Sequence, residues 1–159
     1  MTTQPILLDT CALVYILRGT STGEEIIKTH HLNERKDKPL VSTVSAGELL
    51  ALIAQWNWGE AKIKATHELL RKLVLVPVTT GTIKDVYGEL MNFSMQKGYP
   101  LGQNDHWIAA TAKVTGALMV TTDKDFDGLH EDGKVERILH VLVESKAASG
   151  HRRKQSKGH

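Results

Sequence analysis

The chain has 159 residues, a length typical of a single domain, and its hydrophobic fraction of 41% is ordinary for a globular protein. A single cysteine, Cys11, excludes an internal disulfide, and without a basic leader or an apolar run long enough to cross a bilayer we expect a soluble, cytoplasmic protein with no membrane contact. Five of the 20 Lys and Arg residues lie beyond Glu144 and leave 15 cations against 18 acids, which argues against a broad electrostatic binder of nucleic acids.

Short apolar runs alternate with helical patterns along the chain. Strands are predicted at Ile6–Leu8, from Leu40 and Val41 onward, at Leu73–Val78, at Ala117–Thr121 and at Ile138–Val143. Helices are predicted between them: a short one that ends near Gly19, then Thr22–Arg35, Val44–Gln55, Glu60–Lys72, Ile83–Lys97 and Asp105–Thr115. This alternation predicts an α/β fold with a parallel sheet and helices on both of its faces.

Two segments have a distinctive composition. The run Val44–Gln55 is apolar on every side, which predicts a helix buried in the core. Residues 145–159 are polar, basic and rich in Gly and Ser, so we expect a disordered tail there, after one domain formed by residues 1–144.

Three carboxylates stand alone in apolar surroundings. Asp9 is the only charged residue before Arg18, Glu48 is the only one between Lys38 and Glu60, and Asp105 is the only acid between Glu89 and Asp123. An ionised carboxylate in such surroundings is costly unless a partner compensates it. No Lys or Arg accompanies these acids in their segments, so a bound cation is the compensation that the pattern favours.

The expected fold brings four acids together. Asp9 and Asp123 each follow a strand, Asp105 begins its helix, and Glu48 lies early in its own helix. In an open parallel sheet the carboxyl ends of the strands share one edge, where ligands bind. Carboxylate oxygens select hard cations such as Mg²⁺ or Mn²⁺, and such ions suit phosphodiester hydrolysis because they activate water and neutralise the phosphate.

The four segments that carry these acids resemble the acidic motifs of PIN domains, and more narrowly those of the VapC-like toxins of bacterial and archaeal toxin–antitoxin modules. The segments are Leu7-Leu8-Asp9-Thr10, Ser45-Ala46-Gly47-Glu48-Leu49-Leu50, Asn104-Asp105-His106-Trp107-Ile108-Ala109-Ala110-Thr111-Ala112 and Thr121-Thr122-Asp123-Lys124-Asp125-Phe126. All four occur in the order of the family, and the resemblance covers about Ile6 to Val143.

The resemblance implies a three-layer α/β/α sandwich with a mostly parallel five-stranded sheet. It also implies an RNA endonuclease that depends on Mg²⁺ or Mn²⁺, forms a homodimer and is inhibited by a small antitoxin protein. The motif positions imply metal-binding catalytic acids at Asp9, Glu48, Asp105 and Asp123, an extra acid at Asp125, and hydroxyls that hold the acids or contact phosphate at Thr10 and Thr121. The polar segment His30–Lys38 departs from the family pattern and leaves the identity of the partner open.

Each motif residue also has a purely structural explanation. Asp is a favoured helix N-cap, so Asp9, Asp123 and Asp105 are each compatible with capping alone. We expect Cys11 to be a small buried residue and His106 to lie on a helix surface or support the site. Trp107 is expected in the core, and Trp56 and Trp58 are expected to pack as well. The pair His30 and His31 does not make a metal site by itself.

The same residues argue against two rival functions. A phospho-receiver domain needs a second acid beside the acceptor aspartate, and a dehalogenase-type phosphatase needs one at position 11, where this chain has cysteine. The alternative that stays open is a non-catalytic protein of the same fold that binds RNA or protein.

Overall fold

The computed structural model describes residues 4–143, and the predicted tail at residues 145–159 lies outside the described residues. Five strands form one sheet in the order β3-β2-β1-β4-β5, and every neighbouring pair is parallel. The strands are β1 (Ile6–Leu8), β2 (Leu40–Ser42), β3 (Val74–Val76), β4 (Leu118–Thr121) and β5 (Arg137–Leu139). The predicted α/β fold with a parallel five-stranded sheet is therefore confirmed.

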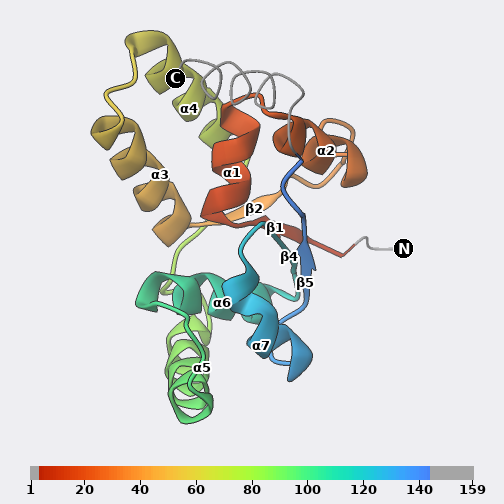
Figure 1. The fold of residues 1–159 in the computed structure, drawn as a ribbon, viewed down its shortest axis with the longest axis vertical. Coiled ribbons are helices and arrows are strands. Elements are labelled where there is room, and N and C mark those ends of the chain that lie inside the picture. The colour runs from red at the N-terminus through yellow and green to blue at the C-terminus, as the bar shows by residue number, and fades with distance from the viewer. Residues whose placement is uncertain (1–3, 144–159) are drawn as a thin grey trace, which may run out of the picture.

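Helices cover both faces of the sheet and make three layers, as Figure 1 shows. On one face lie α1 (Thr10–Leu17), α2 (Ser21–Thr29), α3 (Thr43–Gln55) and α4 (Glu60–Arg71). On the other lie α5 (Ile83–Lys97), α6 (Gln103–Thr115) and the short α7 (Asp127–Glu131), which follows a 3-10 turn, η1 (Lys124–Phe126).

The alternation of side chains along the central strands builds one core on each face. Ile6, Leu8 and Val120 pack in the cluster under α1 and α3. Leu7 and Met119 point the other way and pack against α5 and α6. Because these strands are buried on both faces, they carry continuous apolar runs, as parallel strands do.

The order of the strands changes direction at the boundary between β1 and β4, which are neighbours in the sheet. β2 and β3 add on one side of β1, whereas β4 and β5 add on the other. Ligands of open α/β sheets bind at such a switch point, beyond the carboxyl ends of the strands. Asp9 directly follows β1 and Asp123 comes two residues after β4, so both aspartates lie at this point.

Several predicted boundaries were wrong for identifiable reasons. The helix predicted at Thr22–Arg35 ends at Thr29, because His31 adopts a left-handed backbone (φ 51°). β3 stops at Val76, before a proline that has no N–H to continue the ladder. The last strand ends at Leu139, where its neighbour β4 also ends, rather than at Val143.

Two further differences concern helices. α3 is not buried all round, since only Ser45, Leu49 and Ile53 are buried and Leu50 is 39% exposed. α7 and η1 were not predicted, because their sequence is short and polar. None of the described helices combines the length and apolar character needed to cross a bilayer.

Candidate functional site

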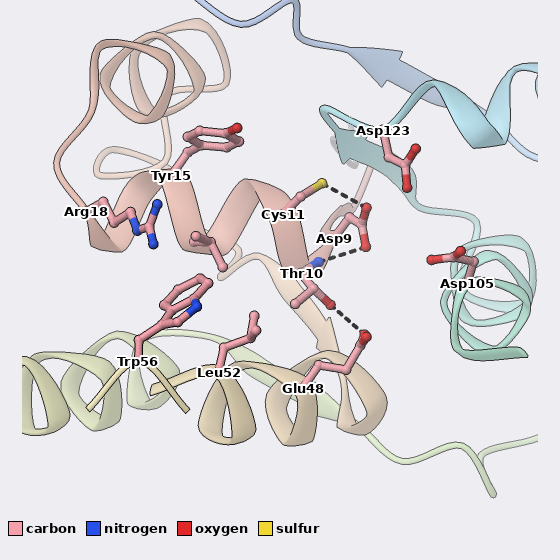
Figure 2. Close-up of a pocket in the computed structure, with 11 residues that line it drawn as sticks. Asp9, Thr10, Cys11, Tyr15, Arg18, Glu48, Leu52, Trp56, Asp105 and Asp123 are labelled. Carbon is pink, nitrogen blue, oxygen red and sulfur yellow. Dashed lines mark hydrogen bonds between the residues drawn. The ribbon is translucent and has the colours of Figure 1, made fainter. Parts of the chain in front are cut away.

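A cavity of about 400 Å³ opens at the switch point of the sheet. Its lining includes Asp9, Glu48, Asp105 and Asp123, which come from four different elements and motifs. Figure 2 shows these acids at one end of the cavity, with Tyr15, Arg18 and Trp56 at the other. All four predicted catalytic acids therefore line one cavity.

Asp9 is the most enclosed of the acids, with 3% of its surface exposed. Its Oδ1 accepts a hydrogen bond from the backbone N–H of Thr10 (2.7 Å), and its Oδ2 accepts from the Thr121 hydroxyl (2.7 Å) and the Cys11 thiol (3.1 Å). Burial raises the pKa of Asp9, these three donors lower it, and the nearby Asp123 raises it again, with a net increase. The site thus holds a carboxylate whose charge is only partly compensated.

Glu48 faces Asp9 from α3. The Thr10 hydroxyl donates a 2.8 Å hydrogen bond to Oε1 of Glu48, which ties α3 to the start of α1 (Figure 2). Both threonines that the sequence singled out, Thr10 and Thr121, therefore hold a carboxylate of the cavity through the side-chain hydroxyl. These bonds fix the orientation of the acids relative to the sheet.

Asp105 is half-buried near the start of α6. Its Oδ2 accepts a 3.3 Å hydrogen bond from the backbone N–H of Gly102, the residue that precedes the helix. Burial raises the pKa of Asp105 to about 6, and the charges of Asp9, Asp123 and Glu48 add to that rise. Asp105 therefore responds electrostatically to the other three acids.

Asp123 combines two roles. Its Oδ1 accepts from the backbone N–H of Asp125 (2.9 Å) and caps η1, while its own backbone N–H donates to the Thr121 hydroxyl (3.0 Å). Asp9 likewise caps α1. The capping explanation is thus correct for both residues, and it coexists with their position in the cavity.

Asp125 is the one predicted metal-site acid that does not line the cavity. It is exposed on η1, and its contact with the site runs through its backbone N–H to Asp123. The structure thus brings four of the five acids together and leaves the fifth at the margin.

The acidic end has no neutralising cation among the residues that the structure describes. Two ion pairs occur among the described residues, His31 with Glu34 and Arg137 with Asp127, and neither involves any of the four acids. Within residues 4–143, no three His, Cys, Asp or Glu side chains converge closely enough to hold one metal ion by themselves. An all-oxygen set of separate carboxylates still fits Mg²⁺, which keeps several of its water ligands and binds one or two carboxylates directly.

Six lining residues were not predicted to belong to the site: Cys11, Val14, Tyr15, Arg18, Leu52 and Trp56. Tyr15, Arg18 and Trp56 extend the cavity away from the acids. A signal for them exists in the helical spacing: Cys11, Val14, Tyr15 and Arg18 share one face of α1, and Glu48, Leu52 and Trp56 share one face of α3. Reading these faces outward from Asp9 and Glu48 would have found them.

Other singled-out residues have clear positions. The thiol of Cys11, expected only to fill space, also donates to Asp9, and burial raises the pKa of Cys11 to about 12. His106 is buried rather than on a helix surface, with hydrogen bonds to Gly102 O (2.7 Å) and Ser94 Oγ (2.8 Å). Trp107 packs against the core, as predicted, and it also stacks on Tyr87.

One polar pair lies away from the cavity. His30, at the end of α2, meets His140 with 2.7 Å between their Nε2 atoms, and both side chains are buried. His31, the neighbour considered with His30, points elsewhere and pairs with Glu34. The histidines adjacent in sequence are therefore not a site together.

Comparisons with known proteins agree on the fold. The family model described as PIN domain matches residues 6–131. A structure of VapBC2 from Rickettsia felis bound to a promoter DNA fragment aligns with a TM-score of 0.73 at 20% identity, covering 86% of this chain and 99% of that one. VapBC-1 from nontypeable Haemophilus influenzae aligns with a TM-score of 0.69 at 22% identity, covering 86% of this chain and 98% of that one. VapBC-5 from Mycobacterium tuberculosis aligns with a TM-score of 0.64 at 23% identity, covering 87% of this chain and 99% of that one. No curated protein matched the chain.

Proposed function

The chain belongs to the PIN domain family, and from this membership together with its acidic cavity we propose that it is a metal-dependent endoribonuclease that acts as the toxin of a toxin–antitoxin pair. The observation that carries the proposal is the meeting of Asp9, Glu48, Asp105 and Asp123 in one cavity with no paired cation among the described residues. Hydrolysis of an RNA phosphodiester is the reaction that such a site suits best.

The four acids are proposed as the ligands of Mg²⁺, and Mn²⁺ is proposed as a substitute. Asp125 is proposed as an extra acid near the site. The bound ion supplies charge neutralisation at the phosphate and lowers the pKa of water. Thr121 and Cys11 keep Oδ2 of Asp9 turned into the cavity, and Thr10 holds Glu48 opposite. The raised pKa of Asp105, about 6, allows this acid to exchange a proton near neutral pH in the metal-free protein.

A small antitoxin is the proposed partner. The solved structures with a similar fold include VapBC proteins of toxin–antitoxin systems and FitAB bound to a DNA fragment. An arginine of the antitoxin suits an acidic cavity, because its planar donor fork matches carboxylates. We further propose a cytoplasmic homodimer and place the nuclease domain at residues 1–144.

The test is cleavage of total RNA by the purified protein, with Mg²⁺ and with excess chelator. The expected products carry a 5′-phosphate and a 3′-hydroxyl, since water is the nucleophile. Cleavage that persists in chelator, or products with 2′,3′-cyclic ends, would contradict the proposal. If the protein binds RNA but does not cleave it, either with or without Mg²⁺, the alternative is correct and the chain is a non-catalytic RNA-binding protein of this fold.

A further inference from the structure

The end of the cavity opposite the acids is built differently from the acidic end. Arg18 and Trp56 occupy it, at the carboxyl ends of α1 and α3, and Figure 2 shows the two side chains close together there. Arg18 lies nine positions after Asp9, a rise of about 13 Å along α1. One continuous cavity thus has an acidic end and a cationic, aromatic end.

The guanidinium of Arg18 lies against the face of the Trp56 indole, with 4.2 Å from its Cζ to the ring centre. Arg18 is exposed, and neither of the ion pairs among the described residues involves it. It is the only Lys or Arg among the described residues that line the cavity. Its Cζ also lies 5.8 Å from the ring centre of Trp58. Because Arg18 is exposed and lines the cavity, its hydrogen-bond donors are available to a ligand.

Trp56 keeps 38% of its surface exposed although it lies in a cluster of side chains. Trp58 packs beside it, with 5.2 Å between ring centres, but does not line the cavity. Lys62 anchors this region by donating a 2.8 Å hydrogen bond to the carbonyl of Leu17, the last residue of α1. This bond ties the end of α1 to α4, and Lys62 Nζ also lies 5.6 Å from the ring centre of Trp58, which follows α3.

We propose that Arg18 and Trp56 form a stacking platform for an unpaired base of single-stranded RNA close to the scissile phosphate, an inference that rests on the proposed nuclease function. A chain that has one phosphate at the acids and continues along the cavity brings a later phosphate toward Arg18, the only Lys or Arg among the described lining residues. Bases stack on tryptophan rings and on guanidinium planes, and only an unpaired base exposes its face for this. The platform selects single-stranded over duplex RNA.

The test measures binding of a fluorescein-labelled single-stranded oligoribonucleotide to the full chain in Ca²⁺, with electrophoresis to verify that the RNA stays intact. Trp56→Leu and Arg18→Gln are each expected to weaken binding about tenfold, the loss typical of one stacked base. Trp58→Leu removes an indole that neighbours both Trp56 and Arg18 but does not line the cavity, and Arg71→Gln removes an exposed cation elsewhere. Both controls are expected to change binding less than about twofold.

An abasic oligomer of the same length isolates stacking from phosphate contacts. It should bind the wild type about tenfold more weakly than the parent RNA does, whereas Trp56→Leu should bind both oligomers equally. Arg18→Lys, which keeps the charge but not the plane, should weaken binding of the parent RNA more than Arg71→Gln does. This milder variant keeps the proposal testable if Arg18→Gln fails to fold.

Several outcomes would overturn the platform. Equal losses in Trp56→Leu and Trp58→Leu would show a structural role, and unchanged binding by Trp56→Leu alongside Mg²⁺-dependent cleavage would remove the platform while leaving the nuclease. A wild type that neither binds nor cleaves RNA would overturn both proposals. If Trp56→Leu and Arg18→Gln bind RNA as the wild type does but no longer co-purify with a small protein that the wild type retains, this surface binds a protein partner instead of RNA.

Discussion

The hydroxyl of Thr121, the last residue of β4, donates a 2.7 Å hydrogen bond to Oδ2 of Asp9, the residue that follows β1. The same hydroxyl accepts from the backbone N–H of Asp123 at 3.0 Å. One buried side chain thus links the two aspartates that follow neighbouring strands, and it does so at the switch point of the sheet. The orientation of Asp9 depends on this link as much as on its own backbone.

Thr121→Val should therefore impair metal binding without unfolding the protein. The Thr121 hydrogen bond lowers the pKa of Asp9, so its removal raises that pKa further and favours the protonated acid at neutral pH. We expect Mg²⁺ affinity to fall about 10- to 100-fold, the usual effect of losing a residue that orients a metal ligand. A Mg²⁺ titration of cleavage measures this. Thr121→Ser keeps the hydroxyl and should behave like the wild type; an equal loss in both variants would contradict the explanation.

Gly23 in α2 lies directly against the backbone of α1. A Cβ built at Gly23 would lie 2.3 Å from the backbone oxygen of Tyr15 in α1. Gly23→Ala must push the helices apart, and we expect it to lower the free energy of unfolding by about 2 kcal/mol or more. Gly88 in α5 has nothing within 4 Å of the same position, so Gly88→Ala should stabilise by about 0.5–1 kcal/mol. Urea unfolding compares them, and a neutral Gly23→Ala would show that α1 and α2 adjust easily.

Residues 145–159 are proposed to be dispensable for folding. Their sequence offers almost no apolar side chains to bury, so truncation before Ser145 should leave the melting temperature nearly unchanged. The five cations of this segment should still contribute to RNA affinity in a salt-dependent way. Thermal melting and RNA binding at two salt concentrations measure both effects. A fall of several degrees on truncation would show that the segment packs on the domain.

The meeting of the four acids could be predicted because it follows from strand order alone. Once β1 and β4 are parallel neighbours, Asp9 and Asp123 must lie at one edge, whatever the side chains do locally. The segments around Glu48 and Asp105 needed only to be helices that start at that edge. The choice of Asp9, Glu48 and Asp105 came from their being isolated charges in apolar segments, a pattern that is visible in the sequence alone.

The features that were missed depend on contacts between distant segments. α7 is short and polar, and the pairing of Asp127 with Arg137 of β5 joins it to the sheet. Leu52 of α3 lines the cavity and is half-buried, and Leu50 is exposed outside it, so the apolar sequence of this helix does not bury the whole helix. The helical spacing places Arg18 and Trp56 on the cavity faces of their own helices, but their contact with each other arises because the two helices end side by side, which depends on the fold.

Asp105→Asn and Asp9→Asn should each abolish cleavage, because an amide is a poor ligand for Mg²⁺, and yet stabilise the metal-free protein at neutral pH. The folded-state pKa of Asp105 is about 6, against 3.8 for the free side chain, and that of Asp9 is also raised. A group with a raised folded pKa favours folding fully below its unfolded pKa, and this advantage is lost as pH rises through the folded pKa. At pH 7 the ionised Asp105 therefore costs stability.

For half-buried Asp105 the gain from Asn should reach about 1–2 kcal/mol at pH 7, after allowance for solvent screening, and vanish near pH 4. Mg²⁺ should raise the melting temperature of the wild type more than that of either variant, since ligand binding stabilises the folded state by mass action. Asp37→Asn, an exposed loop acid outside the cavity, controls for the change in net charge. Capping predicts a different result: Asp9 is an N-cap, and Asn caps as well as Asp. If Asp9→Asn and Asp105→Asn were neutral at both pH values and all proteins responded equally to Mg²⁺, these residues would be structural caps and the proposed metal site would be wrong.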